Sequence, residues 1–497
     1  MSDACDLTAL EARRLIGERR LSAGELLESC IQRIEWLNPA INAIVATDYA
    51  RARQRAAAID AAAAKGEMLG PIAGLPVGIK DLEDTAGLRT TYGSPIFADH
   101  VPLQDARLVR AIRNAGGIVI GKTNVPEFGA GANTRNAVYG ATGNPFDPQK
   151  SVAGSSGGSA AALATGMVPL ASGSDTGGSL RNPAAFCGIV GFRPTPGLVP
   201  SEKRLLGWSG LPVAGPMART VADLALLLSV IVGDDAADPL ATTIRGRTVR
   251  TERDFFPLPP LDLSSLRVAL TADFGFAPTE RVIGAAFAEK TGLFRHVFAR
   301  ADDATPDCSG ADETFAVLRA VGYLAGHLEK VETRRAEVGP NVIANVEEGL
   351  GYTAADVARA AVQQTALYRR WQRFFEEYDL ILSPAITVSP RSWRELYPTE
   401  IDDKKTKSYF HWLALAYVVT LAGHPAISLP MGCDRAGMPF GLQMVGPRGG
   451  DAVLLAAASA LEAMLAADPR TARPVPDLKL LAEAPPIAAS PGFIGFG

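Results

Sequence analysis

The stretch SVAGSSGGSAAALATGMVPLASGSDTGGSLRNPAAFCGIVGFR, residues 151–193, decides the fold. Two Gly/Ser loops, AGSSGGS at 153–159 and SDTGGS at 174–179, are separated by a helical stretch and then an apolar strand. One loop therefore precedes a helix and the other follows a strand, which is where α/β proteins gather their sites. Glycines permit positive φ angles and close backbone approach, so successive N–H groups can converge on one point. Such loops could form an oxyanion hole.

The same alternation of short apolar runs and helical runs extends outward from this stretch. It begins with LPVGI (75–79), DARLVRAIRNAG (105–116) and IVIG (118–121). It returns after Leu380 with ILSPAI, HPAISLP and FGLQMVG. This alternation predicts an α/β body.

The segments that flank these blocks lack the alternation of short apolar and helical runs. Residues 7–67 show helical spacing and predict a surface helical layer, so 1–70 is expected to be an N-terminal layer of the same domain. Residues 266–376 are also helical in pattern, and no motif assigns them a role. An alanine-rich helix is expected over 451–467, so the main body, in which any catalytic domain would lie, is expected to span 70–467. The proline-containing tail, 468–497, is expected to wrap around the body or to fray.

Composition bounds the function. At 497 residues and 47% hydrophobic content, the chain can bury a large core. A net charge of −4 without runs of like charge makes nucleic acid a poor partner. Five scattered cysteines without a C-x-x-C pair predict reduced thiols in a cytoplasm. No secretory signal is recognised at the start, and the apolar run 412–423 is too short for a membrane span, so no membrane association is expected.

Gly/Ser loops also occur as phosphate-binding loops and as the nucleophile elbow of another hydrolase fold. Neither G-x-x-x-x-G-K-[ST] nor a strand-linked G-x-G-x-x-G occurs, which argues against a phosphate cradle. Residues 154–158 match G-x-S-x-G with Ser156 in the nucleophile position. That elbow needs a strand directly before it, and the preceding NPFDPQKSVA (144–153) reads as a loop.

The base that would activate a serine is the next question. The five histidines, none of them near a Gly/Ser loop or at metal-ligand spacing, are His100, His296, His327, His411 and His424. A neutral lysine can replace histidine if burial lowers its pKa toward neutrality. Lys80 ends the apolar run GLPVGIKD (74–81), a setting that we expect of no other lysine in the chain.

Three blocks, GLPVGIKD, AGSSGGSAAALATG (153–166) and SDTGGSLRNPAAFCGIVGFRPT (174–195), together resemble the amidase signature family. Their order and spacing match, and the resemblance covers about 70–235 and 378–465. It implies one large mixed β-sheet flanked by helices on both faces, in a single domain. It also implies a Ser–cis-Ser–Lys triad in which Ser179 is acylated, Ser155 follows a cis peptide bond and Lys80 is the terminal base.

The resemblance also implies supporting roles, without any metal or cofactor. The backbone N–H groups of Thr176, Gly177, Gly178 and Ser179 would hold the oxyanion. Gly129, Ala130 and Gly131 would line the acyl pocket. Asp175 and Arg181 would brace the nucleophile loop.

The expected function is therefore hydrolysis of a small or medium amide, and esters, anilides or carbamates are further substrates to consider. A second hypothesis is an amidotransferase A-type subunit that supplies ammonia to a tRNA-linked partner. Such proteins often carry an S-R-Y-G-like stretch, whereas this chain reads GLVPSEKRLLGWSG at 197–210. A non-catalytic binding protein is the third. Four aromatic residues are candidates for a substrate pocket, although core packing is the commoner role of each: Trp208, Phe128, Tyr139 and Trp412. A homodimer is expected by resemblance alone.

Overall fold

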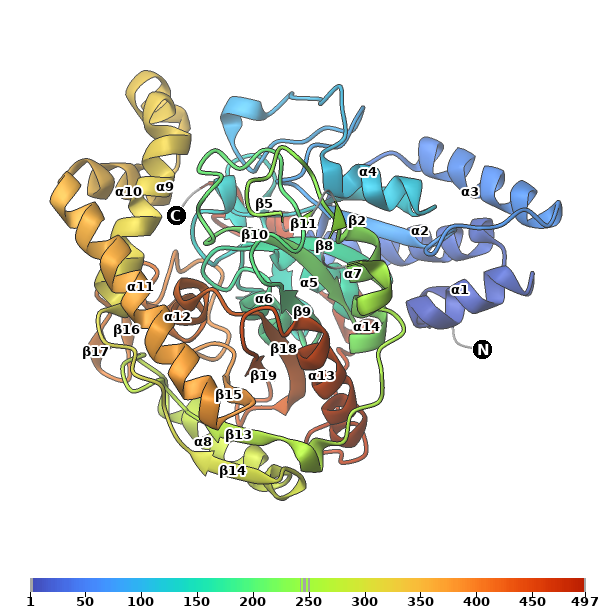
Figure 1. Cartoon of the computed structure of the whole chain (residues 1–497). Helices are drawn as coiled ribbons and strands as arrows, with labels where there is room; N and C mark the ends of the chain where they lie inside the picture. The colour runs from blue at the N-terminus through green and yellow to red at the C-terminus, as the bar shows by residue number, and fades with distance from the viewer. Residues whose placement is uncertain (1–2, 242, 245–246, 249–250, 496–497) are drawn as a thin grey trace.

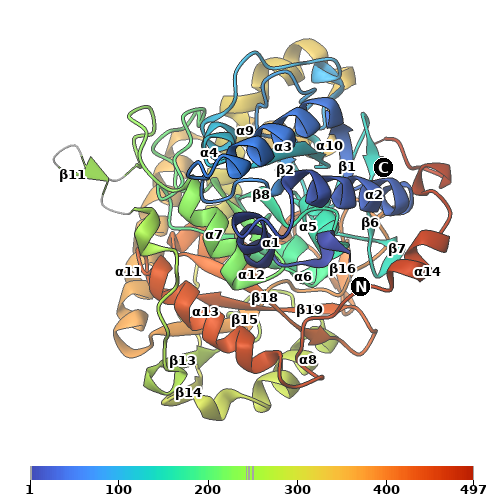
Figure 2. The same cartoon turned by 90° about the vertical axis from the view of Figure 1, so that its right-hand side faces the viewer.

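The computed structural model describes residues 3–241, 243–244, 247–248 and 251–495. An 11-stranded mixed sheet runs through its centre (Figures 1 and 2). In order across the sheet, the strands are β1 (Ile44–Thr47), β3 (Ile118–Thr123), β2 (Pro76–Lys80), β8 (Leu170–Asp175), β10 (Val213–Ala218), β9 (Val190–Arg193), β18 (Ala426–Cys433), β19 (Pro439–Val445), β15 (Leu380–Pro384), β13 (Arg267–Leu270) and β14 (Arg300–Asp303).

Helices cover both faces of this sheet, so the predicted α/β architecture with one large mixed sheet is confirmed. The α-helices of the described residues are α1 (Ala9–Gly17), α2 (Ala23–Ile41), α3 (Tyr49–Ala64), α4 (Arg107–Asn114), α5 (Gly157–Ala164), α6 (Arg181–Cys187), α7 (Val221–Ile231), α8 (Arg281–Gly292), α9 (Ala311–Arg334), α10 (Pro340–Leu350), α11 (Ala354–Glu377), α12 (Ala414–Ala422), α13 (Asp451–Leu465) and α14 (Leu478–Glu483). Helices α9 to α11 lie at one end of the molecule and α1 to α3 at the other (Figure 1).

The two helices that follow the Gly/Ser loops form the centre of the core. Every residue of α5 and α6 is buried. This is expected of α5, which is apolar or small on all sides, whereas α6 also buries Arg181, which pairs with Asp175. Glycines in the strands let α6 approach the sheet closely. A Cβ built on Gly441 of β19 would lie only 2.4 Å from the Cβ of Ala185. This packing fixes the loops at 152–156 and 176–180 against the sheet.

Strand β1 corrects the expectation of a purely helical N-terminal layer. Ile44–Thr47 pairs antiparallel with β3 at the edge of the main sheet. Likewise, β13 and β14 lie within 266–376, where the pattern indicates helices alone. Their sequences, such as IVAT in β1 and RVAL in β13, lack the apolar–polar alternation that indicates a strand. The N-terminal segment thus shares the catalytic sheet, which supports the proposal of a single domain.

A second correction concerns residues 144–153. Part of this segment, expected to be a loop, forms the small hairpin of β6 (Gly143–Asn144) and β7 (Asp147–Ser151). Three further two-stranded sheets of the described residues are β4 (Arg135–Asn136) with β5 (Gly140–Ala141), β11 (Thr243–Ile244) with β12 (Arg247–Thr248), and β16 (Glu400–Ile401) with β17 (Lys404–Lys405).

The C-terminal tail packs back on the body. Helix α14 contacts α2, and Ile487 is buried in a small cluster with Ala141 and Trp393. In the described part of the chain, no helix combines the length and the apolar character needed to cross a membrane.

Candidate active site

The site forms where three strands end. Strand β2 runs parallel to β3 and to β8, so the carboxyl ends of all three point the same way. Lys80 is the last residue of β2 and Asp175 the last of β8. In α/β proteins the crevice at these strand ends is the usual place for a site. The sheet order, with β8 next to β2, therefore brings the lysine and the SDTGGS loop together.

The Lys80 side chain is fully buried among hydroxyl groups. Its Nζ atom lies 2.7 Å from Ser155 Oγ, 2.8 Å from Ser156 Oγ and 2.9 Å from Ser174 Oγ. No carboxylate of the described residues lies within 4.0 Å of Nζ. A neutral amine has two N–H donors and one lone pair, so three hydroxyl partners satisfy it fully. The lone pair can then accept a proton from one of these serines.

Desolvation favours that neutral form. Burial lowers the pKa of Lys80 to about 7, and the negative charges of Glu83 and Asp175 oppose the shift only in part. About half of the molecules would then carry a neutral Lys80 at pH 7. This is the protonation state that a general base requires.

Ser155 joins the lysine to the second loop. The peptide bond between Gly154 and Ser155 is cis, and the Ser155 side chain is almost completely buried. The next residue, Ser156, donates its backbone N–H to the carbonyl oxygen of Ser179 at 3.2 Å. A Cβ built on Gly129 would lie 3.3 Å from Ser155 Oγ, so the 129–131 backbone also closes on this point. The two Gly/Ser loops and the 129–131 segment therefore meet at Ser155.

Ser179 is more accessible than its neighbours. It is partly exposed, whereas Lys80 and Ser155 are buried. Within the described chain its hydroxyl makes no hydrogen bond, and none joins it to the Ser155 hydroxyl. The structure thus pairs Lys80 with Ser155 directly and brings Ser179 to them through its backbone. A serine hydroxyl rotates freely about its Cα–Cβ bond, so the chain leaves this group available to a substrate.

The amides of the SDTGGS loop divide into two groups. Gly178 donates its N–H to Asp175 Oδ1 at 2.9 Å, and Leu180 donates to Asp175 Oδ2 at 3.2 Å. The Gly178 amide is therefore occupied, contrary to the expectation that it binds the oxyanion. The amides of Thr176, Gly177 and Ser179 donate to no other group of the described residues. These three remain the candidate oxyanion donors.

Asp175 holds the loop in place through two arginines. Arg181 donates to both of its carboxylate oxygens, at 3.0 and 2.9 Å, and Arg193 donates to its backbone carbonyl at 2.8 Å. Burial alone would raise the pKa of Asp175, but the charges of Arg181 and Arg193 outweigh it and hold the pKa below the usual range. Arg181 also donates to the Ala416 carbonyl and to Gln443 Oε1. The loop is thus tied to β19 and α12.

Sequence reasoning missed three residues of this cluster. Ser156 matched only the G-x-S-x-G pattern, yet it is buried and lies against Lys80. Ser174 and Arg193 were within the diagnostic stretch but were not singled out. A charged residue such as Arg193 at the end of an otherwise apolar strand is itself a signal, because a buried charge needs a partner.

Lys80 is also less exceptional than expected. Lys122 in β3 is equally buried. It donates to Thr85 Oγ1 at 2.9 Å and to the Glu83 carbonyl, and it lies 3.9 Å from Asp81. The nearby Asp81 carboxylate marks Lys122 as a structural cation, in contrast to Lys80, which has no carboxylate of the described residues within 4.0 Å.

The aromatic candidates do not gather at one place. Trp208 is 81% exposed and Trp412 is buried. Phe128 packs on the His327 ring at 4.5 Å, and the Arg89 guanidinium lies 5.2 Å from the Tyr139 ring. They do not form a shared aromatic pocket.

Among the described residues, one group, Asp3, Cys5 and Asp6, comes close enough together to hold a metal ion. Arg33 already pairs with both carboxylates at 3.0 Å. A cation there would have to displace the guanidinium.

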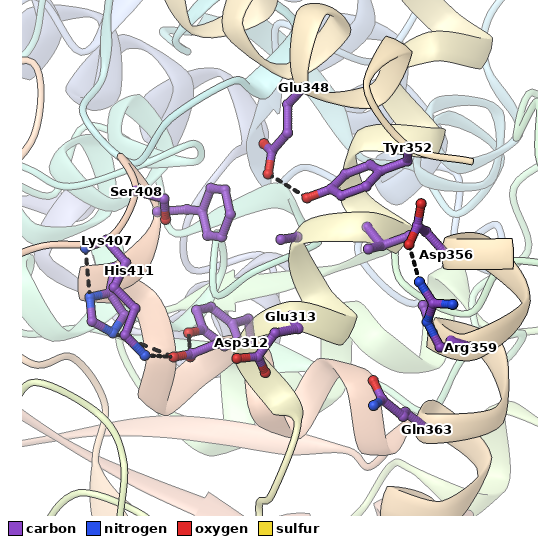
Figure 3. Close-up of a pocket in the computed structure, with 15 residues that line it drawn as sticks. Asp312, Glu313, Glu348, Tyr352, Asp356, Arg359, Gln363, Lys407, Ser408 and His411 are labelled. Atoms are coloured by element: carbon purple, nitrogen blue, oxygen red, sulfur yellow. Dashed lines mark hydrogen bonds and ion pairs between the residues drawn. The ribbon is translucent and has the colours of Figure 1, made fainter. Parts of the chain in front are cut away.

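Figure 3 shows a pocket of about 480 Å³. Asp312, His411 and Tyr417 are among its lining residues, and none of the triad candidates is. Tyr417 separates it from the nucleophile loop, since its Cβ would lie 3.9 Å from a Cβ built on Gly177.

Comparison with known proteins agrees with this geometry. A family model described as Amidase matches residues 25–455. The chain belongs to the amidase family. It is 34% identical to an acylamidase of Rhodococcus erythropolis over 92% of this chain and 95% of that one. It is 35% identical to the A-type subunit of the glutamyl-tRNA(Gln) amidotransferase of Acidothermus cellulolyticus, over 93% and 95%.

The solved structure of a bacterial aryl acylamidase of the amidase signature family superposes with a TM-score of 0.84, at 26% identity over 98% of this chain and 99% of that one. The protein is accordingly an amidase, a hydrolase of amide C–N bonds, and the family assignment made from the sequence is confirmed.

Proposed function

We propose that this amidase acts on its own, without a partner protein, on small acyl amides or anilides, through an acyl-enzyme on Ser179. The observation that carries the proposal is the buried Lys80 amine bonded at 2.7 Å to Ser155, in the cluster that also holds the accessible Ser179. The names of the acylamidase and aryl acylamidase relatives support this choice of substrate class.

In the first half-reaction, Ser179 Oγ attacks the carbonyl carbon of the amide. As the C–O bond forms, the Ser179 proton passes to Ser155, whose own proton passes to the neutral Lys80. The negative charge that develops on the carbonyl oxygen is stabilised by the free amides of Thr176, Gly177 and Ser179. The proton then returns through Ser155 to the leaving nitrogen as the C–N bond breaks.

In the second half-reaction, a water molecule replaces the amine and gives its proton to the same relay. The water oxygen bonds to the acyl carbon, the proton returns from Lys80 through Ser155 to Ser179 Oγ as the bond from Oγ to the acyl carbon breaks, and the carboxylic acid leaves. Lys80 is therefore base and acid in turn, which requires a pKa near the working pH. Asp175 and Arg181 take no proton; they keep the donor amides in position.

The test is hydrolysis of matched amides, anilides, esters and carbamates by the wild type and by Lys80→Ala, Ser155→Ala and Ser179→Ala, each checked for folding. We expect the wild type to turn over at least one series and the three variants to lose activity by several orders of magnitude. Retention of activity by a folded Ser179→Ala variant would contradict the proposal.

The amidotransferase relatives make ammonia supply a specific second candidate. Against it, residues 197–210 lack the S-R-Y-G-like stretch. Release of ammonia from glutamine only in the presence of a copurified tRNA-binding partner would favour this role. Absence of turnover with and without a partner would instead favour a non-catalytic binding protein.

We also propose a cytoplasmic location and a homodimer. The five cysteines all carry free thiols, which fits a reducing compartment. The dimer rests on family resemblance, and sedimentation velocity measures it directly.

A further inference from the structure

Arg319 is a buried cation without a counter-ion. It lies on α9 and is only 6% exposed. No carboxylate oxygen of the described residues lies within 4.0 Å of its guanidinium. Most other buried arginines differ: Arg181 and Arg193 share Asp175, for example. Taking an arginine out of water without a counter-ion is strongly unfavourable unless other interactions compensate for the lost hydration.

Aromatic rings supply part of that compensation. The Arg319 guanidinium lies 4.9 Å from the Tyr323 ring centre, 5.0 Å from that of Tyr409, 5.2 Å from that of Phe410 and 5.9 Å from that of Phe315. Ring faces attract the charge, but they accept few hydrogen bonds. The guanidinium carries five N–H donors that still need acceptors.

The protein meets this need only in part. Arg319 Nε donates to Asn345 Oδ1 at 3.0 Å, and Nη2 donates to the hydroxyls of Tyr323 and Tyr409. Its Nη1 donates to no atom of the described chain. The Tyr409 hydroxyl also accepts from Asn345 Nδ2. With two donors on its oxygen, the Tyr409 O–H proton points elsewhere and has no acceptor among the described residues. The two N–H groups of Nη1 and the Tyr409 O–H therefore have no acceptor in the described chain, on two side chains that contact each other through Nη2.

Two carboxylates of the neighbouring pocket are already engaged. In the pocket of Figure 3, Asp312 binds Lys407 and Tyr417, and Glu348 accepts from Tyr352 at 2.8 Å. Phe410 lies between that pocket and Arg319, because it lines the pocket and faces the guanidinium. These two carboxylates therefore do not supply an acceptor for Arg319 Nη1, and a ligand can supply one.

The neighbours of Arg319 reach both candidate site loops. On one side, Phe315 lies 3.1 Å from a Cβ built on Gly177, in the SDTGGS loop. On the other, Asn345 donates to the Asn341 carbonyl, and Asn341 Nδ2 lies 2.6 Å from a Cβ built on Gly131. Arg319 thus stands one residue layer behind the two segments that bound the reacting carbonyl.

We propose that Arg319 and Tyr409 bind a carboxylate of the substrate, so that this enzyme prefers amides that carry a carboxylate group. A carboxylate offers two acceptor oxygens and one negative charge, which match the unused donors and the unpaired cation. The proposal rests on the proposed amidase function of the neighbouring loops. Matched substrate pairs distinguish a carboxylate on the acyl part of the substrate from one on the leaving amine.

The experiment compares charged and neutral members of matched pairs. Glutaric acid mono-4-nitroanilide with pentanoic acid 4-nitroanilide tests the acyl side, and 4-acetamidobenzoate with acetanilide tests the leaving side. The wild type should prefer the charged member of one pair. Arg319→Gln should lower kcat/KM for that member by about 10- to 100-fold, mainly through KM, and change the neutral member by less than about threefold.

Three further variants make the result specific. Arg319→Lys keeps the charge and should restore part of the preference. Tyr409→Phe removes one donor and should weaken it without abolishing it. Arg219→Gln is the matched control, because Arg219 is also buried without a carboxylate within 4.0 Å but donates to backbone carbonyls of Cys5, Leu7 and Val168. It should leave the preference unchanged.

Equal losses on charged and neutral substrates would show that Arg319 is structural and would overturn the proposal. If the wild type hydrolyses no substrate, the proposed function fails, and carboxylate binding is measured separately as the shift in melting temperature by glutarate against pentanamide and by benzoate against benzamide. No greater shift by either carboxylate than by its neutral partner would refute binding. If Arg319→Gln does not fold, the substrate preference of the wild type and its weakening in Tyr409→Phe test the proposal instead. No preference in the wild type for the charged member of either pair would then overturn it.

Discussion

The pH dependence of amide hydrolysis tests the role of Lys80 most directly. With a pKa of about 7, half of the Lys80 side chains are neutral at pH 7, against about one in 3,000 at the ordinary value of 10.5. At pH 5 the neutral fraction falls to about one in 100. We therefore expect kcat/KM to rise about fiftyfold between pH 5 and pH 7 and to level off above pH 8.

A substitution at Glu83 should shift the pH profile in a known direction, because the charge of Glu83 raises the pKa of Lys80 against the effect of burial. Glu83→Gln should move the midpoint of the profile below pH 7. The assay is the initial rate on an amide without ionisable groups, at low substrate concentration, from pH 5 to pH 9.

Burial also raises the pKa of Glu83 to about 7, so its charge is only partly present at the midpoint. Two further buried groups titrate nearby and serve as controls. Burial raises the pKa of Glu127 to about 7 and lowers that of Lys122 to about 8. Glu127→Gln and Lys122→Met, where folded, should keep the wild-type midpoint. A rate independent of pH between 5 and 7, or a midpoint that moves with Glu127, would refute the assignment of the base to Lys80.

Further changes test the loop and its packing. Ser179→Ala should lower kcat by about 10⁴-fold or more, with the melting temperature little changed. Asp175→Asn leaves two buried arginines unpaired and should cost about 3–5 kcal/mol in urea unfolding. Between pH 7 and pH 10.5 the unfolded chain binds more protons at Lys80 than the folded chain, so this residue makes stability rise with pH; Lys80→Met should remove up to about 1.4 kcal/mol per pH unit of that slope in urea titrations. Gly158→Ala places a Cβ 2.2 Å from the Asn124 nitrogen and should destabilise by more than about 2 kcal/mol, whereas Gly284→Ala, with free space around it, should stabilise by up to about 1 kcal/mol in the same assay.

Local chemistry made much of the fold and site predictable. The position of a lysine at the end of an apolar strand singled out Lys80, whereas Ser155 and Ser179 were identified as candidates by the resemblance of the three blocks to the amidase signature family. The occupied Gly178 amide could not be read in this way, because it depends on the direction in which the Asp175 side chain turns.

Contacts between residues far apart in the sequence were the main limit on predicting the site from the sequence. The partners of Arg181 on α12 and β19 lie 235 and 262 residues away, and no spacing rule connects them. Arg319 lies in a helix that matches no motif. It stands out only in the structure, because its buried guanidinium has no carboxylate partner among the described residues. Strand β1 is short and flanked by helices, so its four residues were absorbed into the helical pattern.

The distance between Arg181 and its partners has a consequence for how the protein is made. During synthesis, SDTGGS leaves the ribosome long before the chain reaches Gln443, so the Arg181 guanidinium waits without its amide and carbonyl acceptors. The nucleophile loop can reach its final form only after almost nine-tenths of the polypeptide has been synthesised. Nascent or prematurely terminated chains would thus be catalytically silent, and a newly made molecule would gain activity late, when the C-terminal strands join the sheet.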